Sequence, residues 1–284
     1  MSAASRNANQ TRSRPPAYFW AGVALVGFYW FLNWDLDGLR THVLFFPLWL
    51  GYCLVVDGIV CWRKGNSLIT RSPAHYALLF LISAPVWWVF EGLNLITGNW
   101  HYLGREAFSS LQYFLLSSLS FSTVIPAVFS TAELIGTFKF VDRFKLKRRL
   151  RLKRAIFWRI HQAGWIMLLL MILFPKLLFP FLWLSLFFIL DPLNALDGKR
   201  SLIADLSSGN LRLWILYGTA PLVCGFFWEL WNFYSYPKWI YTIPYLDVLH
   251  IFEMPLAGYG GYIPFGWELI ALYLFVSPKN QAPG

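Results

Sequence analysis

The sequence predicts an all-α fold, namely a polytopic membrane helix bundle of about eight spans arranged as two parallel four-span repeats. Of the 284 residues, 57% are hydrophobic, 20% aromatic and only 13% charged, a composition that does not fit a water-exposed surface. Several apolar stretches approach or exceed the ~20 residues that cross a ~30 Å hydrocarbon core. The two halves of the chain also resemble each other.

Hydropathy divides the chain into apolar stretches separated by polar or turn-rich connections. The first span follows a polar tail, residues 1–16, and does not have the form of a cleavable signal peptide. The last contains GYGGYIP (258–264), which predicts a broken or strongly kinked helix because Gly and Pro release backbone hydrogen bonds. The predicted spans are 17–33, 43–62, 76–96, 109–138, 155–174, 177–190, 213–234 and 245–276.

The positive charges indicate the topology. If both termini are cytoplasmic, twenty of the 24 Lys and Arg residues lie in the inside segments, and four lie outside. The inside segments include the basic linker 139–154 and the polar tail 277–284. The net charge of +10 therefore reflects orientation in the membrane, and we expect no nucleic-acid partner. The predicted localisation is the membrane, with N and C termini cytoplasmic.

An internal repeat relates residues 17–138 to residues 155–276. Laying residues 44–69 on 178–203, an offset of 134, gives nine identities in 26 positions. Further matches follow after a short slip, and the tripeptide ELI recurs at 133–135 and 268–270. Four spans per copy make the two repeats parallel. The pairs after the slip are Glu91/Glu229, Asn94/Asn232, Trp100/Trp239 and Tyr102/Tyr241.

Four glutamates are the candidate catalytic residues. An ionisable group at the centre of a span costs about 2.5–3.5 kcal/mol on insertion scales, so it should face the bundle interior. A desolvated carboxyl that keeps its proton can act as a general acid. The alternative is a polar clamp between helices. Glu253 has no acidic counterpart in the first half, which suggests that one copy is active. The candidates are Glu91, Glu229, Glu253 and Glu268.

Polar and aromatic residues near these glutamates are the candidate binding residues. Asn94 and Asn232 follow their glutamates by three positions, on the same helical face. The aromatic residues either anchor the chain at the membrane surface or line a lipid pocket, where ring faces could stabilise a carbocation. The aromatic candidates are Trp228, Trp239 and Tyr241.

No cofactor or metal is expected. The chain has no nucleotide-binding, serine-hydrolase or zinc-protease motif. A metal site at Asp247, His250 and Glu253 is the weaker interpretation, because no clustered His motif accompanies that spacing. Asp57 and Asp191, which end the second span of each copy, are expected to fix the loops that follow them.

The order WELWNFYSYPKWIY followed by FEMPLAGYGGYIPFGWEL resembles the small integral-membrane lycopene cyclases of carotenoid biosynthesis, which consist of two similar domains. The resemblance implies that Trp228, Glu229 and Asn232 correspond to their W-D-N element, and Trp239 and Tyr241 to their W-x-Y element. Glu253 or Glu268 would stand near their P-L-E-E helix. It also implies that these carboxyls protonate the end of a polyene.

Three functions remain open from the sequence. The first is a cofactor-independent isomerase or intramolecular lyase that cyclises an isoprenoid or lipid. The second is a transporter of a small solute or lipid, which the repeats and the broken last helix would suit. The third is a non-catalytic membrane subunit that packs against pigments or protein partners. The expected partners are a lipid or isoprenoid and the membrane, and an oligomer or partner subunits are compatible with each function.

Overall fold

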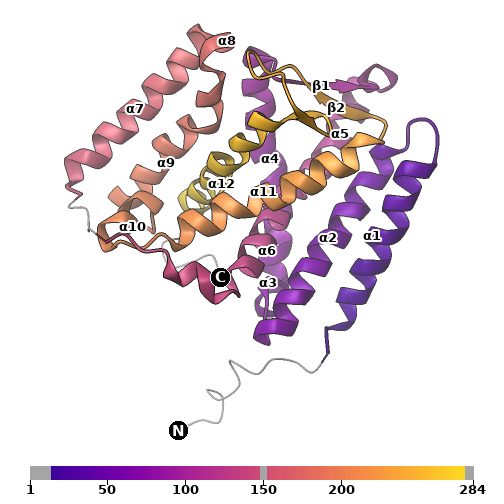
Figure 1. Cartoon of the computed structure of the whole chain (residues 1–284), viewed down its shortest axis with the longest axis horizontal. Helices are drawn as coiled ribbons and strands as arrows, with labels where there is room; N and C mark the ends of the chain where they lie inside the picture. Colours follow the sequence, from indigo (N-terminus) through magenta and orange to yellow (C-terminus); the bar gives the residue numbers. More distant parts are fainter. Residues whose placement is uncertain (1–13, 148–151, 279–284) are drawn as a thin grey trace. The chain divides into compact units, whose positions relative to one another are not determined.

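The computed structural model describes residues 14–147 and 152–278 and is dominated by helices (Figure 1). Six of the helical stretches in this part of the chain are long and apolar enough to cross a membrane: Thr41–Lys64, Pro73–Thr97, Ser110–Gly136, Arg154–Leu173, Pro175–Leu196 and Arg212–Phe233. The prediction of a helical membrane protein is therefore confirmed at this level.

The chain forms two compact units. Unit 1 comprises residues 1–89, 102–138 and 230–239, and unit 2 comprises residues 90–101, 139–229 and 240–284. The units are thus not the two halves of the sequence taken whole, because short segments around residues 90–101 and 230–239 belong to the unit formed by the other half. The predicted limits of the sequence repeats stay a prediction.

Unit 1 is organised around α2 (Thr41–Lys64), which packs against α1 (Ala17–Asp35) and α6 (Val124–Gly136). Figure 1 shows α1 and α2 lying side by side. Ser67 caps the short helix α3 (Leu68–Arg71), and Ser109 caps α5 (Ser110–Phe121), each through a reciprocal capping box. The other elements of the first half are α4 (Pro73–Thr97), β1 (Trp100–Leu103) and the 3₁₀ turn η2 (Arg105–Ala107).

Unit 2 is organised in the same way around α9 (Ser185–Leu196), which packs against α7 (Arg154–Leu173) and α12 (Tyr262–Val276). The strands are short: β1 pairs with β2, and β3 pairs with β4 in an antiparallel hairpin. The remaining elements are η3 (Lys139–Arg143), α8 (Pro175–Leu178), η4 (Phe179–Trp183), α10 (Leu202–Ser208), α11 (Arg212–Phe233), β2 (Lys238–Tyr241), β3 (His250–Ile251), β4 (Met254–Pro255) and η5 (Leu256–Gly261).

Glycine allows the helices at the centre of each unit to approach closely. A Cβ on Gly22 of α1 would lie 2.8 Å from the Leu54 Cβ and 2.9 Å from the Val55 amide nitrogen of α2. A Cβ on Gly164 of α7 would lie 2.7 Å from the Ile189 amide nitrogen of α9. Val55 and Ile189 are related by the offset of 134 found in the sequence. Small residues at helix contacts are characteristic of membrane bundles, where close packing replaces hydrophobic association.

Large apolar side chains remain exposed on the outer helices. Leu95 on α4 is 86% exposed and Leu81 is 73% exposed. On α7, Ile166, Leu169 and Leu173 are also more than half exposed. Exposed apolar side chains in such numbers are unfavourable in water and are normal on a helix that faces lipid.

One span differs from the sequence prediction: the expected last span, 245–276, contains the α-helix α12 only in its second half, because residues 250–261 form the β3–β4 hairpin and the 3₁₀ turn η5. The expected spans 109–138 and 177–190 correspond to the stretches Ser110–Gly136 and Pro175–Leu196, of which the first is divided into α5 and α6 and the second contains η4. Helices α1 and α12 are not among the six that meet the length and hydropathy needed to cross a membrane.

Parts of three predicted polar segments lie outside the described residues. These parts are residues 1–13 of the N-terminal tail 1–16, residues 148–151 of the linker 139–154, and residues 279–284 of the C-terminal tail 277–284.

The contact between α11 and α12 predicts a sharp response to substitution. A Cβ on Gly266 would lie 1.7 Å from the Tyr217 carbonyl oxygen and 2.5 Å from the Pro221 Cγ. Since backbone cannot yield as a side chain does, Gly266→Ala should lower the free energy of unfolding by at least about 1–3 kcal/mol. Thermal unfolding in detergent or nanodiscs measures this. The matched control is Gly27→Ala, since a Cβ there has no neighbour within 4 Å and should leave stability unchanged or slightly raised. Equal stability of the two variants would contradict the packing described.

Candidate functional site

Glu229 is the most deeply buried of the candidate acids in unit 2. It lies near the end of α11, and its residue is 0% exposed. Its Oε1 accepts hydrogen bonds from the Tyr241 hydroxyl at 2.6 Å and from the Tyr262 hydroxyl at 2.9 Å. Tyr241 ends β2 and Tyr262 begins α12. The carboxyl therefore ties three segments of unit 2 together.

The two phenols are donors that keep their protons. Burial raises the pKa of Tyr241 well above its ordinary value, and the Glu229 carboxyl beside it raises this pKa further. Phenol hydroxyls can both donate and accept, so they can hold Glu229 in one orientation and can also pass a proton to it. Tyr241 was predicted from the W-x-Y pattern. Tyr262 was missed, because nothing in the GYGGYIP sequence distinguishes its phenol from the neighbouring Tyr259.

An apolar cluster covers these phenols. Phe179, Ile243 and Met254 are buried together, and Tyr241, Tyr259 and Tyr262 pack against them. Met254 belongs to the β3–β4 hairpin, so the segment that replaces the expected helix closes this side of the Glu229 environment. Apolar cover of this kind excludes water, which strengthens every electrostatic interaction with the carboxyl.

Glu91 lies at the other end of a series of aromatic rings in unit 2. Its Oε1 accepts a hydrogen bond from the Trp100 indole at 3.0 Å, and the residue is partly exposed. The Trp100 ring lies 5.9 Å from the Trp183 ring, which lies 5.7 Å from the Phe265 ring. Phe265 is 1% exposed.

The series continues from Phe265 to the phenol that binds Glu229. The Phe265 ring lies 6.4 Å from Trp228, and Trp228 lies 5.9 Å from Tyr262. Phe90 packs against both Trp183, at 5.6 Å, and Phe265, at 5.4 Å. The rings thus connect the surroundings of the two glutamates without a charged side chain in the series. The aromatic residues thus form clusters within unit 2, and a role in anchoring or in binding a lipid stays a prediction.

Asn94 and Asn232 both hold a loop backbone. In unit 2, the Asn94 Nδ2 donates to the Trp100 carbonyl at 2.8 Å, and its Oδ1 accepts from the Trp100 amide at 3.2 Å. In unit 1, the Asn232 Nδ2 donates to the Trp239 carbonyl at 2.7 Å, and its Oδ1 accepts from the Trp239 amide at 2.9 Å. These contacts fix the tryptophans of the W-x-Y pattern, and the Trp239 ring lies 6.1 Å from Phe45. A binding role for either Asn stays a prediction.

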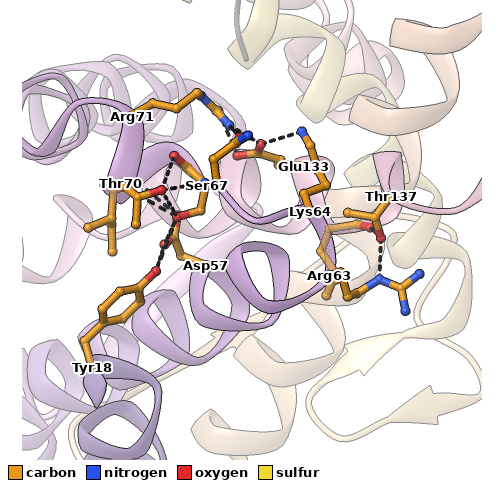
Figure 2. Close-up of polar contacts among 12 residues, drawn as sticks. Tyr18, Asp57, Arg63, Lys64, Ser67, Thr70, Arg71, Glu133 and Thr137 are labelled. Atoms are coloured by element: carbon orange, nitrogen blue, oxygen red, sulfur yellow. Dashed lines mark hydrogen bonds and ion pairs between the residues drawn. The ribbon is translucent and has the colours of Figure 1, made fainter. Parts of the chain in front are cut away.

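Glu268 does not correspond to Glu133, although both begin an ELI tripeptide. Glu133 of unit 1 forms ion pairs with Lys64 at 3.0 Å and Arg71 at 2.6 Å (Figure 2). Glu268 of unit 2 is 1% exposed, and its Oε1 accepts from the Leu186 amide at 3.1 Å. The two ELI tripeptides are separated by 135 positions, whereas Pro126 and Pro264 of the same helices are separated by 138. When the two prolines are aligned, the two glutamates are therefore three positions, or about one helical turn, out of register.

Glu253 lies outside the helices, contrary to the expectation of a carboxyl within a span. It occupies the turn of the β3–β4 hairpin and is partly exposed. Asp247 and His250, its partners in the metal site considered from the sequence, form a pair at 2.9 Å on the exposed side of this hairpin. The described residues contain no group of three or more His, Cys, Asp or Glu side chains that could hold a metal ion.

Asp57 and Asp191 fix loops, as predicted. The Asp57 carboxylate accepts from the Ser67 hydroxyl at 2.6 Å and from the Ile69 amide at 3.1 Å, and also from the Tyr18 hydroxyl (Figure 2). The Asp191 carboxylate accepts from the Ser201 hydroxyl at 2.6 Å and from the Leu202 and Ile203 amides. Ser201 and Ile203 lie 134 positions after Ser67 and Ile69. Both aspartates therefore serve a structural role at the start of a short helix.

No protein-family model matches the chain, and the searches of curated proteins and of solved structures gave no match either.

The loop contacts of Asn232 predict a measurable loss on truncation. Asn232→Ala removes the side-chain donor and acceptor that bind the Trp239 carbonyl and amide. Each buried group left unsatisfied lowers the free energy of unfolding by about 1–3 kcal/mol. Asn232→Asp keeps the acceptor and loses only the donor, so its melting temperature should fall between wild type and Asn232→Ala. The same order is expected at Asn94. An Asn232→Ala protein with the wild-type melting temperature would show that this clamp contributes no stability.

Proposed function

We propose that the chain is an integral-membrane enzyme that protonates a double bond of an isoprenoid or related lipid and thereby starts its cyclisation or isomerisation. The observation that carries this proposal is the Glu229 carboxyl, fully buried, hydrogen-bonded by two phenols and followed by a series of aromatic rings. Glu229 would be the general acid.

The chemistry needs no cofactor. The Glu229 proton adds to one carbon of a double bond, and the cation left on the other carbon is attacked by a second double bond, closing a ring. Loss of a proton from a neighbouring carbon restores a double bond, so the product has the mass of the substrate. Glu229 would regain a proton from water by relay through the Tyr241 or Tyr262 hydroxyl, which would accept one proton as it donates another.

The aromatic rings supply what the cation would require. A cation over a ring face gains about 0.5–2 kcal/mol, with the larger values at desolvated sites. Trp228 stands next to the Tyr262 ring and Phe265 next to Trp228, and neither carries a charge that would quench the intermediate. Glu91, at the other end of the series, would be a second acid or the acceptor of the departing proton.

The substrate class rests on the sequence resemblance to the integral-membrane lycopene cyclases. Trp228, Glu229 and Tyr241 take the positions that the resemblance assigns to binding and catalysis. Carotenoid or other isoprenoid polyenes are therefore the first substrates to test. Glu253 and Glu268 are secondary candidates, because Glu253 lies in a hairpin turn and Glu268 caps a helix.

A transporter is the second candidate function, and one observation favours it. The apolar stretch Pro175–Leu196 is interrupted by η4, and the N-terminus of α9 begins within it beside the buried Glu268. Discontinuous helices whose ends bind substrates or ions are characteristic of secondary transporters. Uptake of a labelled solute into vesicles that Glu268→Gln abolishes would support this function.

We also propose that the chain arose by duplication of a four-span unit, giving eight spans with both termini cytoplasmic. Helices α1 and α12 would supply the two spans beyond the six. Matching contacts in the two units support the duplication. Asp57 and Asp191 each bind the serine of the loop that follows. A glycine of the neighbouring helix also approaches Val55 in one unit and Ile189 in the other. The distribution of Lys and Arg supports the orientation.

The proposed reaction predicts a product that depends on Glu229. Isoprenoid-producing cells, including a lycopene producer, would express wild type, Glu229→Gln or Tyr241→Phe, and their pigments and lipids would be compared by liquid chromatography–mass spectrometry. Wild type should give a new product of unchanged mass. Glu229→Gln should abolish it, and Tyr241→Phe should reduce it about 10²-fold to 10⁴-fold if the phenol supplies the proton. Glu106→Gln, an exposed residue in η2, is the control and should behave as wild type. An unchanged lipid profile with folded wild-type protein in the membrane would reject the enzyme.

The proposed topology predicts which surface positions a membrane-impermeant maleimide reaches in intact cells. Asp37→Cys, in the exposed connection between α1 and α2, should be labelled from outside. Ser208→Cys, at the exposed end of α10, should react only after lysis. The wild-type protein measures the background, because its three cysteines are buried. The reverse labelling pattern would show that the orientation is inverted.

A further inference from the structure

The start of α9 leaves backbone donors inside an apolar stretch. Helix α8 ends at Leu178, η4 follows, and α9 begins at Ser185. The first amides of a helix have no partner within it, and lipid offers none. In unit 1 the corresponding stretch is part of the continuous helix α2, so this break is particular to the second half.

Glu268 satisfies this helix end. It comes from α12, which packs against α9, and its Oε1 accepts from the Leu186 amide at 3.1 Å, with the Phe187 amide contributing. The residue is 1% exposed. One carboxyl oxygen is thus fixed by the first turn of α9.

The second carboxyl oxygen has no such partner. Within the described residues, the Glu268 Oε2 is buried without a hydrogen bond, and so is the Oγ of Ser185, which is 0% exposed. Ser185 immediately precedes Leu186, whose amide holds Oε1. Buried polar atoms are nearly always satisfied, so two orphaned atoms at one helix end indicate a missing ligand.

The charges around Glu268 narrow the identity of that ligand. No Lys, Arg or His in the described chain pairs with this carboxyl. Helix α12 itself carries two other titratable groups, Tyr262 and Tyr273. The elements packed against it carry the following titratable groups: Asp191 on α9, Tyr259 on η5, and Arg212, Tyr217, Cys224 and Glu229 on α11. The Asp191 oxygens are occupied by Ser201, Leu202 and Ile203, and the Arg212 guanidinium bonds Asp142.

A proton fits this environment better than a metal cation. A metal cation needs several protein ligands, and the described residues contain no group of three or more His, Cys, Asp or Glu side chains that could hold one. A buried carboxylate with one unsatisfied oxygen is unfavourable, and a proton on that oxygen both neutralises the charge and creates a donor.

We propose that Glu268 is an exchangeable proton-binding site. The proton binds at Oε2, while Oε1 remains on the α9 N-terminus. The step is the combination of a carboxylate with a proton taken from water, and its reversal. This site is separate from the proposed catalysis at Glu229, and it can be tested without any substrate.

Infrared spectroscopy of the purified protein in nanodiscs tests the site directly. From about pH 5 to about pH 9, wild type should show a protonated-carboxyl C=O band that is missing in Glu268→Gln. Transfer to D₂O should shift the band, which shows that the proton exchanges. Glu133→Gln is the matched control and should leave the band unchanged, because Glu133 is ion-paired with Lys64 and Arg71.

One result would overturn the proposal. If the wild-type minus Glu268→Gln spectrum contained only carboxylate bands throughout this pH range, Glu268 would carry no proton. Thermal unfolding of each variant verifies that the protein remains folded, and Glu268→Asp provides a second, charge-conserving variant if Glu268→Gln fails to fold.

Discussion

The carboxyl groups inside these apolar helices are tolerated only because other parts of the chain bring hydrogen-bond donors to them. An ionisable group at membrane depth costs about 2.5–3.5 kcal/mol or more, so each one constrains the segment that satisfies it. Asp191 holds the start of α10, Glu268 holds the start of α9, and Glu229 holds β2 and α12. The irregular segments of unit 2 are positioned by these contacts.

The carboxyls receive different sets of donors. Asp57 and Asp191 accept from backbone amides and from a serine at a helix start, and Asp57 also accepts from the Tyr18 phenol. Glu229 accepts from two phenols under apolar cover. Phenols can exchange protons with a carboxyl, whereas backbone amides cannot, and for this reason we propose Glu229 as the general acid.

The sequence predicted these features to different degrees. The loop-fixing role of Asp57 and Asp191 was predicted from their place at the end of the second span of each copy, directly before a polar loop. Tyr241 was found through the W-x-Y pattern. Tyr262 was not found, because its hydrogen bond to Glu229 joins residues 33 positions apart. The spacing of residues along a single helix or strand does not predict such a long-range contact. The helical, membrane-spanning character was evident from hydropathy alone.

Other expectations failed for identifiable physical reasons. Residues 245–276 are apolar enough to look like one span, but the hairpin at 250–255 satisfies its own backbone and places Glu253 in a turn. The ELI match was misleading because a shift of about one turn leaves hydropathy nearly unchanged while moving a carboxyl to a different neighbour.

The central claim, that Glu229 donates a proton to a lipid double bond, is tested most directly by isotope incorporation. Purified wild-type protein in lipid would be incubated with isoprenoid polyenes, including lycopene, in D₂O, and the products analysed by mass spectrometry. The account predicts a cyclised or isomerised product that carries one deuterium on carbon and is absent with Glu229→Gln. A product without deuterium, or the same labelled product from Glu229→Gln, would contradict it.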